Sequence, residues 1–298
     1  MILNLQQIPP PLPLAPNNSR VIAFTTPRNY AVRLSQLIHL KGWDPLWCPT
    51  ITVDSTSQTI SSIQHYLLPP NPPLRHFSAV AFTSRAGIAA FADALAGIAT
   101  HPLPSAGEIF TVSALGKDSE LLDGSFIGGL CKNSGRIRVL VPPVATPTGM
   151  AEALGLGQGE KVLCPVPLVI GLEEPPVVPR FLADLGRRGW VPIRVNAYET
   201  QWRSGGAAEL LEAAGGVDAI VFTSTGEVEG LLKGLAEVGL DWGMVVGMCP
   251  RMVAAAHGPV TAAGAERLGV GIDVVSARCE SFDGVVDALD HIWKSCVY

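Results

Sequence analysis

The stretch Ala79-Val80-Ala81-Phe82-Thr83-Ser84 gives the strongest fold signal, because the chain repeats its pattern as Ala219-Ile220-Val221-Phe222-Thr223-Ser224. In each copy the apolar run predicts a buried strand, and the serine predicts the N-cap of a following helix. A helix that begins at the carboxyl end of a strand presents unpaired N–H groups and the positive end of its dipole. One copy alone indicates a capping turn. Two copies predict a ligand with several negative groups.

Two further landmarks are duplicated in the same order. A Gly-x-x-Ser/Thr turn follows each copy, as Gly116-Lys117-Asp118-Ser119 and as Gly258-Pro259-Val260-Thr261. The stretches Gly42-Trp43-Asp44-Pro45-Leu46 and Gly189-Trp190-Val191-Pro192-Ile193 each close a helix with glycine and start a strand. Because three landmarks recur in two halves, the sequence predicts two related α/β domains.

The order of the elements predicts that one domain is inserted into the other. Strands predicted at 21–24 and 46–48 precede a crossing at 49–53, and a second crossing at 196–200 resembles the first. We expect these crossings to pair side by side as a two-stranded β-ladder hinge. Glycines over 124–135 predict a loop. The expected layout is a disordered leader over 1–19, a discontinuous domain 1 over 20–50 and 200–298, and an inserted domain 2 over 54–195.

Composition indicates a folded, soluble α/β chain. Its 298 residues are enough for two domains with cores, and 48% are hydrophobic against 16% charged. The net charge of −5 argues against a nucleic-acid-binding protein, which normally presents a basic face. Every apolar stretch of about 18 residues is interrupted by a charge or a proline, so we expect no membrane span.

The six cysteines are scattered without Cys-x-x-Cys spacing, which predicts reduced thiols. Cys48, Cys164 and Cys249 each precede proline. Cys-Pro pairs can ligate haem iron through the thiolate, whereas a strand-end cysteine before a turn proline is the simpler interpretation. The leader lacks the composition of a transit peptide or a secretory signal. We therefore expect a reducing compartment, either the cytoplasm or the plastid stroma.

Four groups of residues together resemble the uroporphyrinogen-III synthase family, from about Val21 to Trp293. They are Thr26-Pro27-Arg28, the two Phe-Thr-Ser turns, 195–200 and Gly258-Pro259-Val260-Thr261-Ala262. The resemblance implies two flavodoxin-like domains with parallel sheets, joined by a β-ladder, and a substrate in the cleft between them. It also implies a monomeric lyase of haem and chlorophyll biosynthesis. Such an enzyme dehydrates hydroxymethylbilane and closes its ring with inversion of the last pyrrole, without metal or organic cofactor.

The turns and the resemblance together predict the site residues. Tyr198 matches the family's tyrosine and is the expected catalytic residue, assisting departure of the hydroxyl group. Its alternative role is packing in the β-ladder. Ser119 and Thr261 match the family's hydroxyl residues at the glycine turns. The predicted substrate-binding residues all lie at strand ends: Thr26, Arg28, Thr83, Ser84, Arg85, Gly116, Lys117, Ser119, Thr223, Ser224, Thr225, Gly258 and Thr261. The three basic residues of this set could pair with carboxylates or remain solvated.

Three features depart from the family pattern. Val260 stands where a threonine is often repeated, and Asp118 places a negative charge inside the first glycine turn. After Cys164, the stretch 165–176 is expected to form an acidic, proline-rich loop that lines the cleft. Two other functions therefore stay open. One is a catalytically inactive family member that binds a tetrapyrrole, with the Cys-Pro pairs as haem ligands. The other is a two-domain, hinge-closing protein that binds sugars or small anions.

Overall fold

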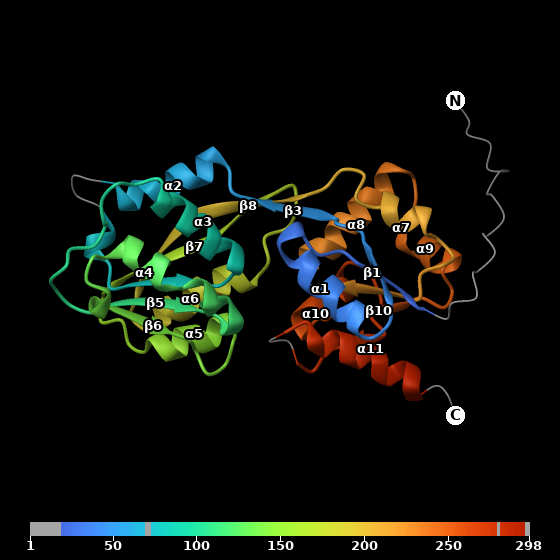
Figure 1. Ribbon diagram of the computed structural model, residues 1–298. Helices are drawn as coiled ribbons and strands as arrows, with labels where there is room; N and C mark the ends of the chain where they lie inside the picture. The colour runs from blue at the N-terminus through green and yellow to red at the C-terminus, as the bar shows by residue number, and fades with distance from the viewer. Residues whose placement is uncertain (1–18, 69–72, 279–280, 296–298) are drawn as a thin grey trace. The chain divides into compact units, whose positions relative to one another are not determined.

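The computed structural model describes residues 19–68, 73–278 and 281–295 of the chain. Its contacts divide the chain into two compact units (Figure 1). The first unit holds the N-terminal strand, Tyr30–Thr50 and the chain from Ser204 onward, and the inserted unit holds Ile51–Arg203 with Pro27–Asn29. The leader predicted over 1–19 lies outside the described residues, apart from Ser19. Among the described residues, no helix is long and apolar enough to span a bilayer.

The sheet of the first unit is parallel throughout, in the order β11-β10-β9-β1-β2. Its strands are β1 (Val21–Phe24), β2 (Asp44–Trp47), β9 (Ala219–Phe222), β10 (Val253–Ala256) and β11 (Val274–Val275). β1 lies between β2 and β9, with Ala23 opposite Ile220. The N-terminal strand therefore shares a sheet with the second Phe-Thr-Ser copy, which is the pairing that the two crossings predict.

Helices cover both faces of this sheet. Ile22 and Phe24 belong to one apolar cluster and Ala23 to another, because successive strand side chains point to opposite faces. The first cluster includes buried residues of α1 (Arg28–Leu40) and α11 (Asp283–Ser295), which cover one face. The second contains α7 (Ala208–Glu212), α8 (Thr225–Glu237), α9 (Trp242–Met248) and α10 (Pro259–Arg267).

The sheet of the inserted unit has the order β3-β8-β7-β4-β5-β6 and is parallel except at β3. Its strands are β3 (Ile51–Asp54), β4 (Ala79–Phe82), β5 (Phe110–Ala114), β6 (Ile137–Leu140), β7 (Lys161–Ile170) and β8 (Val191–Trp202). β3 pairs antiparallel with the end of β8, from Ile51 opposite Trp202 to Asp54 opposite Glu199. The two crossings therefore form the predicted ladder, as an extension of this sheet.

The inserted unit is also layered on both faces of its sheet. One face packs against α2 (Ser57–Leu67), α3 (Arg85–Ala96) and α4 (Gly124–Leu130). The other packs against α5 (Pro147–Leu154) and α6 (Val177–Arg187). Short 3₁₀ turns occur at η1 (Pro73–His76), η2 (Gly116–Leu121) and η3 (Ser134–Arg136). Two mostly parallel sheets between helices confirm the predicted α/β fold class.

The loop predicted over 165–176 is wrong for its first half, because β7 continues to Ile170. Beyond Cys164 the strand stays paired with β8, with a bulge between Val166 and Pro167. The pairing with β4 stops at Leu163. One side of β7 is therefore open beyond that point, and a strand with an open side tolerates the missing N–H groups of proline. Only 171–176 connects β7 to α6.

The glycine-rich loop predicted over 124–135 is also wrong for its first half, where α4 forms. Asp123 caps this helix, because its carboxylate accepts the N–H of Phe126 at 2.9 Å. Phe126, Ile127 and Leu130 are buried in the core of the inserted unit. The cap and this burial outweigh the poor helix propensity of glycine, which is about 1 kcal/mol per residue.

The contact between α8 and α10 depends on Gly264. A Cβ at this position would overlap the Thr225 hydroxyl and lie 2.8 Å from the Thr225 Cβ, which belongs to a stiff β-branched side chain. We expect Gly264→Ala to lower the free energy of unfolding by about 1–3 kcal/mol, measured by urea denaturation. The matched control is Gly247→Ala in α9, where a Cβ meets nothing within 4 Å. Equal stability of the two variants would contradict the close packing.

Candidate functional site

Both Thr-Ser turns form, and in each the serine caps a helix. The Ser84 hydroxyl oxygen accepts the N–H of Gly87 at 3.1 Å where α3 begins. The Ser224 hydroxyl oxygen accepts the N–H of Glu227 at 3.4 Å where α8 begins. Each turn directly follows the carboxyl end of an inner strand, β4 or β9. The first N–H groups of both helices therefore lie at the carboxyl edge of their sheet, which is the edge where ligands of parallel α/β folds bind.

The turn of the first unit holds a carboxylate that belongs to the chain itself. Glu227 is 1% exposed. Its carboxylate accepts the Thr223 N–H at 2.9 Å and the hydroxyls of Thr223, Ser224 and Thr25, the last at 2.7 Å. The Thr50 hydroxyl donates to the main-chain carbonyl of Glu227 at 2.7 Å. Donors that the sequence assigned to a ligand thus have a partner inside the protein.

Sequence reasoning missed Glu227, although the sequence contains a signal for it. Ser224-Thr225-Gly226-Glu227 matches the capping-box pattern, in which a glutamate at the third helical position reaches back to the start of its helix. The first copy reads Ser84-Arg85-Ala86-Gly87 and has glycine in that place. The two turns therefore share a backbone plan but differ in the chemistry that they present.

The pKa of Glu227 is raised above its ordinary value of 4.5, mainly because burial disfavours the charged form. Hydrogen bonds from Thr223, Thr25 and Ser224 act in the opposite direction and do not fully compensate. The folded state therefore binds this proton more tightly than the unfolded state. The resulting stabilisation is fully present below the unfolded-state pKa and is lost as the pH rises through the folded-state pKa.

We therefore expect the free energy of unfolding of the wild type to fall, relative to Glu227→Gln, as the pH rises above about 4.5. The glutamine variant is the matched control, since its side chain has the same size and does not titrate. Urea denaturation of both proteins between about pH 4 and pH 8 measures the difference. A difference that stays constant, or that favours the wild type at higher pH, would contradict the raised pKa.

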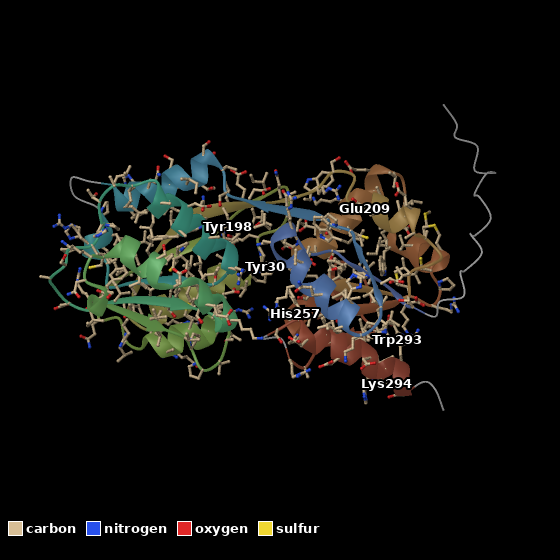
Figure 2. The ribbon with its side chains drawn as sticks, in the orientation of Figure 1. Tyr30, Tyr198, Glu209, His257, Trp293 and Lys294 are labelled. Carbon is tan, nitrogen blue, oxygen red and sulfur yellow. The ribbon has the colours of Figure 1, made fainter. Side chains whose placement is uncertain are left out.

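In the inserted unit, the predicted catalytic residue meets the predicted capping residue. Tyr198 lies on β8 (Figure 2), is 7% exposed and belongs to the core that contains α2 and α3. Its hydroxyl oxygen is 2.8 Å from the Ser84 hydroxyl oxygen, and either group could be the donor. Burial raises the pKa of Tyr198 to about 12; Ser84 lowers it and the nearby Asp118 raises it. The phenol is thus both packed in the core and held, protonated, at the start of α3.

The glycine turn of the inserted unit uses its own hydroxyl internally. Gly116 has a φ of +46°, in the left-handed region that favours glycine. The Ser119 hydroxyl donates to the Gly116 carbonyl at 2.7 Å. Asp118 lies 3.9 Å from a guanidinium nitrogen of Arg85, and this ion pair offsets the negative charge that departs from the family pattern. Lys117 is exposed beside them.

The remaining predicted residues lie around β1 and α10 of the first unit and, for Arg28, in the short segment Pro27–Asn29 that groups with the inserted unit. The Thr26 hydroxyl is buried and has no hydrogen-bond partner among the described residues, whereas Arg28 is exposed at the start of α1. Gly258 caps α10 with an extended backbone (φ −169°), which other residues can also adopt. The Thr261 hydroxyl donates to the Thr223 carbonyl at 3.2 Å. The structure thus ties the glycine turn of the first unit to its Thr-Ser turn.

The cysteines that precede proline lie in the interior. Cys48 and Cys164 are 0% exposed and Cys249 is 4% exposed. Burial raises the pKa of the Cys164 thiol well above its ordinary value. A thiolate ligand of haem iron has to be deprotonated and accessible. These environments argue against haem binding through the Cys-Pro pairs.

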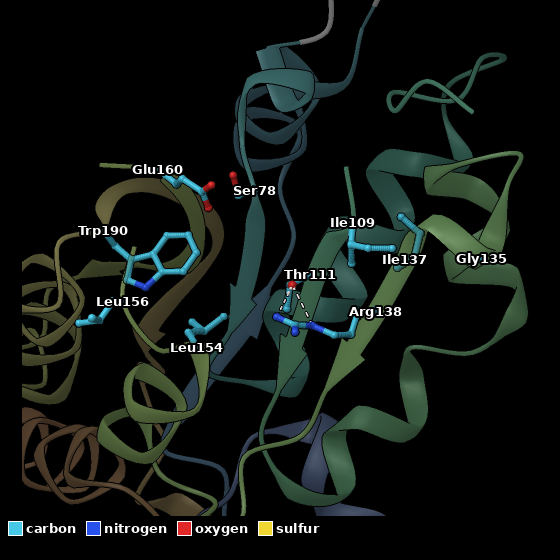
Figure 3. A pocket seen from close by; sticks show the side chains of 10 residues that line it. All are labelled: Ser78, Ile109, Thr111, Gly135, Ile137, Arg138, Leu154, Leu156, Glu160 and Trp190. Carbon is cyan, nitrogen blue, oxygen red and sulfur yellow. Dashed lines mark hydrogen bonds between the residues drawn. The ribbon is translucent and has the colours of Figure 1, made fainter. Parts of the chain in front are cut away.

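A pocket of the inserted unit lies at the opposite end of the sheet from the Thr-Ser turn (Figure 3). Its walls come from the amino ends of the strands, including Glu160 and Trp190 before β7 and β8. Arg138 and Thr111 both line it, and the Arg138 guanidinium donates to the Thr111 hydroxyl at 2.9 and 3.2 Å. The pocket contains none of the residues predicted to bind a substrate.

One family model matches most of the chain. The family model described as uroporphyrinogen-III synthase HemD matches residues 32–285. A mutant uroporphyrinogen III synthase from Thermus thermophilus aligns with 93% of this chain and 100% of its own, at 17% identity and a TM-score of 0.54. The uroporphyrinogen-III synthetase of Helicobacter pylori aligns with 92% of this chain and 99% of its own, at 12% identity and a TM-score of 0.47. A search of curated proteins gave no match.

Proposed function

Since the chain belongs to the uroporphyrinogen-III synthase family, we propose that it is the synthase itself. It would convert hydroxymethylbilane to uroporphyrinogen III, with loss of water and inversion of the last pyrrole ring. The observation that supports this most directly is the helix N-terminus at Ser84, which lies at the carboxyl edge of a parallel sheet with the Tyr198 phenol beside it. This turn combines an anion site with a hydrogen-bond donor.

Binding requires positive sites for a flexible substrate with several carboxylates. Helix N-termini supply such sites without a net positive chain, because their N–H groups and dipole act locally. At the turn of the inserted unit, Gly87 leaves the position of the internal carboxylate without a side chain. Arg85 at the same turn is paired with Asp118, so exposed Lys117 at the glycine turn supplies the additional positive charge. The inserted unit therefore offers the stronger grip on a substrate carboxylate.

The proposed reaction depends more on the positioning of the substrate than on strong acid catalysis. Hydroxymethylbilane closes unaided to the wrong isomer, so the protein has to hold one folded conformation of it. Loss of the hydroxyl produces a cation that the pyrrole nitrogen of the substrate itself stabilises. Tyr198, with a pKa of about 12, stays protonated at neutral pH. It would donate a hydrogen bond to the departing hydroxyl group, with Ser84 orienting the phenol.

The test is to supply freshly made hydroxymethylbilane to the purified protein and to resolve the product isomers after oxidation. We expect the inverted isomer to exceed its share in the spontaneous reaction. A wild-type protein that leaves the spontaneous ratio unchanged would exclude the synthase. The second candidate would then be a non-catalytic family member that binds a tetrapyrrole, which the burial of Tyr198 at 7% exposure favours.

We expect Tyr198→Phe to lower kcat about 10²-fold, at the lower end of the range for a proton donor. KM should change little, because the phenol is not one of the groups proposed to bind the substrate carboxylates and the Ser84 cap of α3 stays in place. Ser84 keeps its bond to the Gly87 N–H, so the fold should lose only about 1 kcal/mol of stability. Steady-state kinetics and urea denaturation measure the two effects. If the variant forms the inverted isomer as fast as the wild type, the proton comes from water or from a substrate carboxyl group.

Gly116→Val should raise KM sharply by crowding the glycine turn, and Gly159→Val is its matched control. Both glycines lie in the inserted unit with positive φ, +46° and +87°, so both variants carry a similar backbone strain. Only Gly116 lies at the carboxyl edge, because Gly159 precedes the amino end of β7. We expect KM to rise at least about tenfold more for Gly116→Val than for the control. Equal KM values would count against a substrate site at this turn.

A further inference from the structure

The duplicated turns are alike in backbone and cap but differ three residues after the serine. In the inserted unit that residue is Gly87, and in the first unit it is Glu227. Both serines have an extended backbone, with φ and ψ of −153° and 152° at Ser84 and −148° and 158° at Ser224. The contrast is therefore one of side-chain chemistry on a shared backbone.

The donors around Glu227 are those that a bound carboxylate would use. One oxygen accepts the Thr223 N–H at 2.9 Å and the Thr25 hydroxyl at 2.7 Å. The other accepts the hydroxyls of Thr223 and Ser224. A carboxylate with hydroxyl and N–H donors at a helix N-terminus is the arrangement expected for an anionic ligand. Here the chain supplies the carboxyl group itself.

Glu227 is also fixed in place by groups outside its own turn. Thr25 follows β1, and the Thr50 hydroxyl holds the Glu227 carbonyl at 2.7 Å. The residue is 1% exposed, so moving its carboxylate out would leave these donors unpaired in the interior. Glu227 is therefore a permanent occupant of the turn at Ser224.

We propose that Glu227 determines specificity by taking the place of a substrate carboxylate at the Ser224 turn. The turn at Ser84 is then open to a substrate carboxylate, and the turn at Ser224 is closed to one. This inference rests on the proposed function for the identity of the substrate. The occupancy of the Ser224 turn, however, is testable without any turnover.

The geometry at Gly87 fits this division of roles. A Cβ there would lie 3.3 Å from the Pro165 carbonyl oxygen and 3.4 Å from the Ser84 hydroxyl oxygen. An alanine therefore causes mild crowding, whereas a glutamate adds a carboxylate at the position that Glu227 has in the other turn. Substitutions at Gly87 and Glu227 can thus exchange the character of the two turns.

The first experiment opens the closed turn with Glu227→Gly and uses acetate as the probe. We expect acetate to raise the thermal midpoint of this variant by about 2–4 °C over sodium chloride of equal ionic strength, because acetate replaces the lost carboxylate. The wild type should show no such difference. Refolding of the variant in acetate alone would also support the proposal. A folded variant that responds equally to acetate and chloride would overturn it.

The second experiment closes the open turn and decides the question if Glu227→Gly does not fold in either salt. Gly87→Glu is compared with Gly87→Ala, which has the same Cβ contact with Pro165 but no carboxylate. We expect at least about a tenfold higher KM for the glutamate variant. If the proteins do not turn over the substrate, the Kd of hydroxymethylbilane is measured for both variants by tryptophan fluorescence and compared in place of KM. Equal values for the two variants would overturn the proposal, whereas an inactive wild type would overturn only the proposed function.

Discussion

The N–H groups that α3 and α8 leave unpaired at their first turns are the constraint on which this structure depends. A parallel sheet places the start of each crossover helix at the carboxyl ends of its strands, and these donors have no partner within the helix. Ser84 and Ser224 satisfy one N–H group each as N-caps. The residues around each turn then decide whether the other donors face a protein group or a ligand.

The two units meet this constraint in different ways. In the first unit, Glu227 fills the turn, and hydrogen bonds from Thr25, Thr223 and Ser224 offset only part of the effect of burying its carboxylate. In the inserted unit, glycine stands at the equivalent position and Tyr198 hydrogen-bonds to the capping serine. One backbone motif therefore provides a closed, self-satisfied turn and a turn that combines free helix donors with a protonated phenol.

The two local errors of sequence interpretation have a common cause. Pro165 and Pro167 led to the prediction of a loop, because proline lacks an N–H group. The pairing of β7 with β4 ends before these residues, however, so the strand accommodates them. The glycines of α4 read as a loop because glycine weakens an isolated helix, yet Asp123 and three buried apolar residues stabilise it. In both cases the neighbours in space outweigh the local preference.

The duplicated order of strand, Thr-Ser turn and helix is a local pattern, and so the sequence by itself determined the two α/β units, the capping serines and the pairing of the crossings. Which donors remain open depends on residues far apart in the chain. Thr25 reaches Glu227 across 202 positions, and Ser84 reaches Tyr198 across 114. Only the tertiary structure could decide these contacts, because a hydrogen bond is set by distance in space and by burial, neither of which sequence spacing encodes.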